Sequence, residues 1–289
     1  MKKIIAAAVA AAFVAPAFAA DITISGAGEV IFIDTAGTTS TQVDQVFSVK
    51  ATQELANGMT VSTDINMGAD ASSENGLFNE GGNSVTVSGA FGKIDMGDTS
   101  GAVDAIDDIT ESAKELGVGS GGDDAAVLWT LPTLAEGLTI NLSMNTDENT
   151  ADATVSTAGK ANGASVKYSN SGLTIGYGVN DYDSNVEEAI YNASYSMSGV
   201  TVAVESLKDT AADGSETKYS NVGITYKTGD LMLGYESQEK KSSGTVSNEY
   251  NVVTAQYSLG GGVTAYVETY EDTKTANSDK TALGLEFKF

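Results

Sequence analysis

Alternation of apolar and polar residues runs through most of this 289-residue chain and constrains its fold more than any other feature. The alternation is unbroken over residues 138–144, and it continues through residues 283–289 to the last residue of the chain. Successive side chains of a β-strand point to opposite faces of the sheet. Each alternating segment therefore predicts a strand with one apolar and one polar face.

The connections between these segments also follow a pattern. Short turns contain Gly or Asn, the residues that tolerate positive φ in hairpins. They lie at 57–58, 90–92, 136–137, 171–172, 198–199, 229–230 and 260–262. Longer polar stretches separate them, at about 34–42, 68–83, 98–125, 145–163, 180–188, 207–218, 238–249 and 271–281. Seven short turns and eight long loops join sixteen strands into an up-and-down arrangement, with all short turns at one end.

The number of strands decides which face is apolar. Taken singly, each alternating segment favours a soluble protein, with one face buried in the core and the other in water. A closed barrel of sixteen strands, however, encloses a lumen too wide for side chains to fill, so its apolar face has to point outward into lipid. Short turns at one end and long loops at the other are typical of outer-membrane barrels. The sequence therefore predicts an all-β, sixteen-stranded antiparallel transmembrane barrel, formed as one domain by residues 20–289.

The first residues have the three parts of a secretory signal peptide. Lys2 and Lys3 provide the charged region, residues 4–14 the apolar region, and residues 17–19 an Ala-Phe-Ala cleavage site. The apolar run is too short for a transmembrane anchor. We expect residues 1–19 to be removed on export.

Composition excludes several classes of function. The chain contains no Cys, no His and no Arg, which excludes disulfide scaffolds, thiol catalysis, Ser-His-Asp triads and the usual zinc sites. Its formal net charge of -24 would repel the phosphates of a nucleic acid. Carboxylates are abundant, but no position marks any of them as an acid or base of catalysis. We therefore expect no enzymatic activity.

The alternation also predicts which charged residues face the lumen. On the first three strands these are Glu29, Asp44, Lys50 and Asp64, which we expect to form the pore wall. On later strands the same parity selects Glu205, Glu236, Glu268, Glu286 and Lys288. The alternative is that some of these residues lie above or below the membrane and solvate the rim.

The longest connection, residues 98–125, carries a dense group of acids around a single base, Lys114. The acids are Asp98, Asp104, Asp107, Asp108, Glu111, Glu115, Asp123 and Asp124. A helix-like turn over residues 102–116 would place Ala102, Ile106 and Ile109 on one face, which needs an apolar partner. We therefore predict that the loop folds into the barrel and that Asp98, Asp104, Asp107, Asp108, Glu111 and Glu115 form the constriction. A solvated acidic loop outside the barrel is the alternative.

Two pairs of adjacent acids in this loop are weak candidates for calcium binding, because Ca²⁺ prefers oxygen ligands. They are Asp107 with Asp108 and Asp123 with Asp124. The spacing of an EF-hand is absent. We therefore expect no cofactor, with Ca²⁺ as the only candidate ion.

Three segments resemble general bacterial porins, most closely the short sixteen-stranded porins of alpha-proteobacteria. Residues 87–98, Val-Ser-Gly-Ala-Phe-Gly-Lys-Ile-Asp-Met-Gly-Asp, resemble the hairpin before the third loop of that family. Residues 128–137, which begin Leu-Trp-Thr-Leu-Pro, resemble the strand and turn after that loop. Residues 283–289 resemble its terminal strand, whose last aromatic residue is recognised by the barrel-insertion machinery.

The resemblance implies a homotrimer of water-filled channels in the outer membrane of a Gram-negative bacterium, in contact with lipid and lipopolysaccharide and inserted through Phe289. Its third loop, here residues 98–125, would narrow each channel. The family often opposes the loop acids with Arg residues on early strands. Here Glu29, Asp44 and Gln45 stand in that region, with Lys50 as the nearest base.

From the lumen and loop acids we predict passive, cation-selective diffusion of small hydrophilic solutes and ions. The rival reading of the acidic, Gly-rich composition is a secreted or surface-anchored β-rich binding protein, such as an adhesin or a calcium-stabilised surface-layer module.

Overall fold

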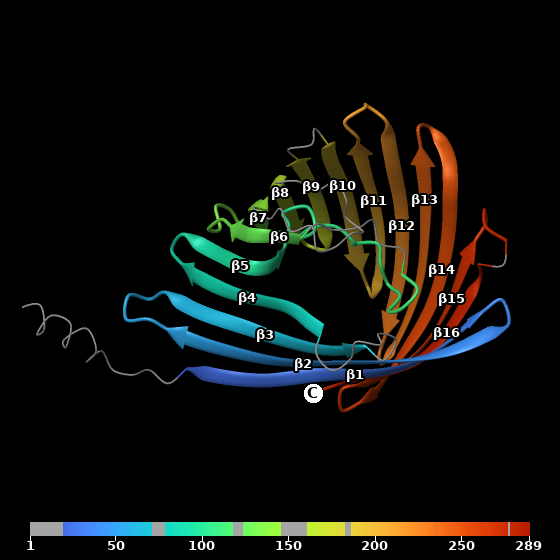
Figure 1. The fold of residues 1–289 in the computed structure, drawn as a ribbon, viewed down its shortest axis with the longest axis horizontal. Coiled ribbons are helices and arrows are strands. Elements are labelled where there is room, and N and C mark those ends of the chain that lie inside the picture. Colours follow the sequence, from blue (N-terminus) through green and yellow to red (C-terminus); the bar gives the residue numbers. More distant parts are fainter. Residues whose placement is uncertain (1–19, 71–78, 118–123, 146–160, 183–185, 277) are drawn as a thin grey trace, which may run out of the picture.

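The computed structural model describes residues 20–289 except 71–78, 118–123, 146–160, 183–185 and 277 (Figure 1). The predicted signal peptide, residues 1–19, lies outside the described residues. Among the described residues, no helix is long and apolar enough to cross a membrane.

Sixteen β-strands form one closed antiparallel barrel in which each strand pairs with its neighbours in sequence (Figure 1). The strands are β1 (Asp21–Thr35), β2 (Thr38–Glu54), β3 (Thr60–Asp70), β4 (Asn79–Gly89), β5 (Gly92–Ser100), β6 (Asp124–Thr130), β7 (Leu138–Asn145), β8 (Ala161–Asn170), β9 (Leu173–Tyr182), β10 (Val186–Met197), β11 (Val200–Thr210), β12 (Glu216–Thr228), β13 (Leu231–Ser242), β14 (Thr245–Gly260), β15 (Val263–Asp272) and β16 (Lys280–Lys288). The predicted number of strands and their up-and-down order are confirmed.

The barrel closes where β1 meets β16. Glu29 lies opposite Glu286 in this pairing, and the chain ends by exchanging two backbone hydrogen bonds. Gly26 N donates to Phe289 O at 3.1 Å, and Phe289 N donates to Gly26 O at 3.0 Å. Residues 27–35 of β1 pair with residues 280–288 of β16, and this pairing closes the sheet into a barrel.

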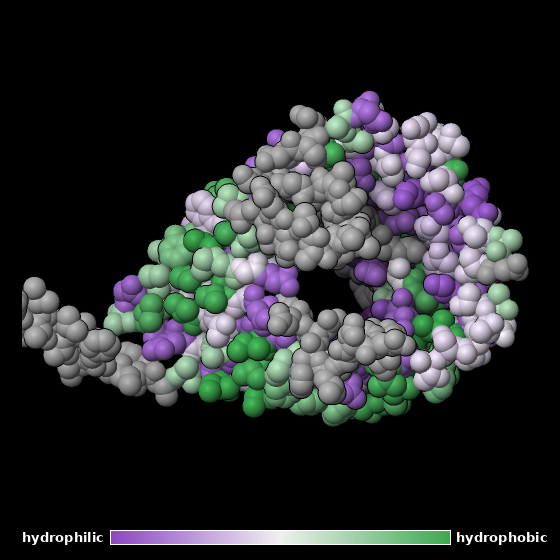
Figure 2. Space-filling view, in the orientation of Figure 1, coloured by the Kyte–Doolittle hydropathy of each residue, from purple (hydrophilic) through white to green (hydrophobic). Residues whose placement is uncertain are grey.

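The outer surface is apolar and the lumen surface polar, as the alternation predicts. On β11 the exposed side chains of Val202 and Val204 alternate with Ala203 and Glu205, which are 3% and 4% exposed. Each of the other strands also carries at least one exposed large apolar side chain, and Figure 2 shows hydrophobic residues on the left and lower parts of the surface. The sequence prediction of an exterior apolar band is therefore confirmed.

The predicted long loops at 34–42, 207–218 and 238–249 are largely strand. β1 and β2 continue to a two-residue turn at Ala36 and Gly37, and β13 and β14 to a similar turn at Ser243 and Gly244, all four with positive φ. Polar composition alone suggested loops. These residues instead keep their backbone groups paired in the ladder, so the hairpins continue beyond the apolar band.

Candidate functional site

Residues 101–117, here called the inner loop, lie between β5 and β6 and contact the lumen side of the opposite wall. Figure 1 shows this segment running inside the barrel toward β12 and β13. The inner loop is held toward both ends: the backbone N–H of Ala102 donates to Ser143 Oγ at 2.9 Å, and the side-chain Nζ of Lys114 donates to Glu286 Oε2 at 2.5 Å. The inner loop thus runs along the inside of the wall from β7 to β16.

Glu236 of β13 anchors the middle of the inner loop. Its side chain is only 1% exposed, and its Oε1 accepts hydrogen bonds from the backbone N–H groups of Ser112 and Ala113, the second at 2.6 Å. Gln256 Nε2 donates to the carbonyl oxygen of Ser112 at 2.7 Å. A buried carboxylate is costly unless donors surround it, so this charge stabilises the inner loop only in its docked position.

Glu268 of β15 binds the next three residues in the same way and is also 1% exposed. Its carboxylate oxygens accept backbone hydrogen bonds from Lys114, Glu115 and Leu116, at 2.5, 3.0 and 2.9 Å. Hydrogen bonds to a charged acceptor contribute about 1.5–3 kcal/mol each. The two glutamates therefore act as acceptors for five successive backbone donors.

The apolar residues of the inner loop cover apolar patches on the lumen wall. Val103 and Ile106 are almost fully buried against Ile190 and Leu207. Leu116 lies in a second cluster with Ile31, Val252, Tyr266 and Ala282. These contacts explain why a polar lumen carries a few large apolar side chains.

The helix-like turn predicted for residues 102–116 is only partly correct. Single turns form, with Ala105 N donating to Gly101 O and Asp107 N to Val103 O, but no helix follows. Ala102 and Ile106 are buried as predicted, whereas Ile109 is only half-buried. The chain leaves the helical conformation at Asp108, whose φ of 52° lies in the left-handed region.

Gly223 of β12 allows the closest approach of the inner loop to the wall. A Cβ at this position would lie 2.2 Å from the carbonyl oxygen of Thr110, a backbone atom that cannot rotate away. We expect Gly223→Ala to displace the inner loop and raise the single-channel conductance by roughly one and a half- to threefold, since pore width limits flow.

The matched control for this change is Gly28→Ala on β1, where a Cβ would meet nothing within 4 Å. Its conductance should equal that of the unaltered protein, and both variants should remain folded in detergent. Equal conductance for Gly223→Ala and Gly28→Ala would show that the inner loop does not limit the channel.

The wall facing the inner loop from β2 to β6 is polar and carries ion pairs. Lys50 Nζ lies 3.1 Å from Asp64 Oδ2, as expected for two pore-wall residues on one face. Lys93 Nζ lies 2.7 Å from Asp95 Oδ2. These four side chains and Ala105 of the inner loop line one pocket of about 430 Å³. Figure 2 shows an opening in the middle of the molecule with hydrophilic residues along part of its rim.

Glu29 and Asp44 complete the acidic part of this wall. They are direct cross-strand partners on β1 and β2, and both are half-buried. Burial raises the pKa of Glu115 on the inner loop, and the negative charges of Asp44 and Glu29 raise it further. Carboxylates of loop and wall therefore act on one another across the lumen.

Two acids of the inner loop have strongly raised pKa values. Burial, followed by the charges of Asp108 and Asp104, raises the pKa of Asp107 to about 9. Burial and the charge of Asp108 raise the pKa of Glu111 to about 7. Asp107 is therefore neutral at pH 7.

The remaining predicted site residues are not gathered into one cluster. Asp104 and Asp108 lie half-buried on the inner loop. Asp98 belongs to β5 and is exposed, so it lies on a strand and not on the loop. Of the calcium candidates, Asp123 and the side chain of Asp124 lie outside the described residues. Among the described residues, no three or more acids are arranged to hold a metal ion.

Sequence reasoning missed Lys93 and Asp95 on the wall. Both lie in the alternating segment after the turn at 90–92. They alternate with the outward-facing Met96, so the alternation could have placed them on the lumen side. It did assign Glu236 and Glu268 to the lumen, but as charges of the pore and not as anchors.

Comparison with known proteins agrees with this architecture. A search of the curated proteins gives no match. Among solved structures, Salmonella typhi OmpF in complex with daunomycin has a TM-score of 0.77 at 14% identity, covering 93% of this chain and 97% of that one. A mutant of the Rhodopseudomonas blastica porin has a TM-score of 0.74 at 16% identity, covering 93% and 100%. Residues 6–277 match the model of a family described as Gram-negative porin, and this chain belongs to that family.

Proposed function

We propose that this outer-membrane channel conducts cations in preference to anions during passive diffusion of small hydrophilic solutes. Membership of the porin family and the sixteen-stranded barrel make the chain a channel and not an enzyme. They favour this function over a secreted binding protein, and the exposed apolar band on the outer surface does the same. The preference for cations over anions is the part of this function that we propose.

The observation that carries the proposal is the excess of carboxylates at the constriction. The inner loop has five acids and one base, so acids outnumber the base even with Asp107 protonated. That base, Lys114, is paired with Glu286, while Lys50 and Lys93 are paired with Asp64 and Asp95. Because these bases are already neutralised, the remaining carboxylates lower the potential in the lumen and concentrate cations there.

The assembly and its partners follow from the family and the terminal strand. We propose a homotrimer in contact with outer-membrane lipid and lipopolysaccharide, formed after cleavage of residues 1–19. Phe289 ends β16 in a backbone pair with Gly26 and stacks on Phe287 at 5.8 Å between ring centroids. This exposed aromatic end is the part that we expect the insertion machinery to bind.

The test is the reversal potential of the purified protein in planar bilayers under a KCl gradient. We expect its sign to show preference for K⁺, and the preference to weaken as salt rises, because the Debye length falls from about 10 Å at 0.1 M to about 3 Å at 1 M. A reversal potential of the opposite sign would overturn the selectivity and leave the channel function intact.

A further inference from the structure

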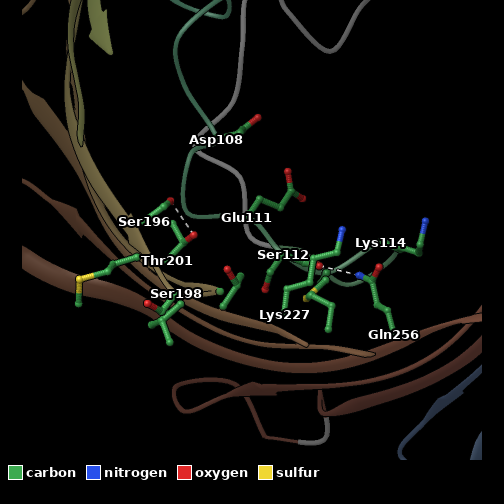
Figure 3. Close-up of a pocket in the computed structure, with 15 residues that line it drawn as sticks. Asp108, Glu111, Ser112, Lys114, Ser196, Ser198, Thr201, Lys227 and Gln256 are labelled. Carbon is green, nitrogen blue, oxygen red and sulfur yellow. Dashed lines mark hydrogen bonds between the residues drawn. The ribbon is translucent and has the colours of Figure 1, made fainter. Parts of the chain in front are cut away.

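A pocket of about 730 Å³ lies between the inner loop and the ends of β10–β14 nearest the short turns (Figure 3). Asp108 and Glu111 line it from the loop, and Ser196, Thr201 and Lys227 line it from the barrel wall. Its volume falls within the roughly 300–1,000 Å³ that is usual for small-molecule sites. The pocket is therefore large enough to bind a small solute that contacts the loop and the wall at the same time.

The pocket is lined by Asp108, Glu111 and Lys114 of the inner loop and by Lys227 of the wall; Lys114 is already paired with Glu286 of β16. Glu111 belongs to the loop and Lys227 to β12, and within the described residues neither side chain forms an ion pair. An unpaired carboxylate and an unpaired ammonium thus line one water-filled space. Asp108 adds a second acid on the side of the loop.

We propose that this pocket is a transient binding site for small zwitterions, namely free amino acids and dipeptides. The ammonium group of the solute binds the carboxylates of Glu111 and Asp108, and its carboxylate binds the ammonium of Lys227. This inference rests on the proposed channel function and names a preferred class of solute for it. Binding must remain weak, because a channel site has to release its solute.

Other small solutes satisfy only part of this arrangement. A simple cation is attracted by the loop acids but repelled by Lys227. A simple anion is attracted by Lys227 but repelled by the acids. An uncharged sugar gains hydrogen bonds from hydroxyls such as those of Ser196 and Thr201, which already bond each other at 2.8 Å. Only a dipolar solute uses both charges.

The first test uses the unaltered protein and three related probes. Glutamine carries both charges, N-acetylglutamine only the carboxylate, and glutaminamide only the ammonium. At pH 8 the carboxyl of Glu111 is ionised, since its pKa is about 7. We expect glutamine to interrupt single-channel K⁺ current for longer than either derivative. Equal interruption by all three probes would overturn the site.

The second test measures liposome swelling with glutamine relative to arabinose, an uncharged solute of similar size. Glu111→Gln and Lys227→Gln should each lower this ratio by roughly 1.5- to fivefold, the effect of about 0.2–1 kcal/mol for an exposed ion pair. Lys208→Gln, on the outer end of β11, is the matched control and should leave the ratio unchanged.

The two tests separate this site from the channel itself. Unchanged ratios in both variants, with normal KCl conductance, would overturn the zwitterion site alone. Absence of KCl conductance in the unaltered protein would overturn the channel function and this site with it.

Discussion

Replacing Glu236 and Glu268 together by Gln is expected to raise the mean single-channel conductance by roughly two- to threefold and to add rapid current fluctuations, because pore width controls flow. The two carboxylates accept five backbone hydrogen bonds from residues 112–116. Gln keeps the size of the side chain but removes the charge that strengthens these bonds, and at position 268, where both oxygens accept, its N–H₂ group also faces a backbone donor. The inner loop then loses its anchors while the strand ladders of the barrel stay intact.

Glu239→Gln provides the control for this double variant. Glu239 lies on the same strand as Glu236, but it is paired with Lys241 near the end of that strand and has no hydrogen bond to the inner loop. Its conductance should match that of the unaltered protein. If the double variant also conducts normally and quietly, the anchoring role of the two glutamates is wrong.

Raising the pH from about 6 to about 10 is expected to increase the K⁺ over Cl⁻ permeability ratio by roughly two- to fourfold, in two steps. A carboxyl is neutral below its pKa and negative above it. The pKa of Glu111 is raised to about 7 and that of Asp107 to about 9, so negative charge is added to the constriction near each of these values. Reversal potentials measured at constant KCl gradient check this.

Single variants assign the two steps. Asp107→Asn should leave selectivity at pH 7 almost unchanged and abolish the step near pH 9, because Asp107 is protonated at neutral pH. Glu111→Gln should abolish the step near pH 7. A large loss of selectivity at pH 7 in Asp107→Asn would show that this carboxyl is ionised and that its raised pKa is wrong.

The alternation of the strands predicted the barrel well, but polar stretches were a poor guide to its loops. Parity alone predicted that Lys50 and Asp64 share a face, since side chains of one strand alternate between two faces, and the two form an ion pair. The extension of β1 and β2 to Ala36 was missed, because a polar hairpin and a polar loop have similar composition.

The inner loop was predictable only in outline. Its apolar residues indicated that it needs a partner, and Ala102 and Ile106 do find one inside the barrel. Val103, which the sequence analysis did not single out, is buried against Ile190 and Leu207, whereas Ile109 is only half-buried. The exposed position of Asp98 depends on where β5 ends.

The sequence by itself determined the closed barrel, because sixteen alternating strands have only one arrangement that keeps apolar faces in lipid and pairs every backbone group. Only the tertiary structure decided which acids carry charge. Glu236 and Glu268 stay buried under backbone donors from a segment more than a hundred residues away in sequence. Asp107 is surrounded by other acids and holds its proton. Local composition cannot distinguish these carboxylates, because a charge is set by the burial and the neighbours that folding brings to it.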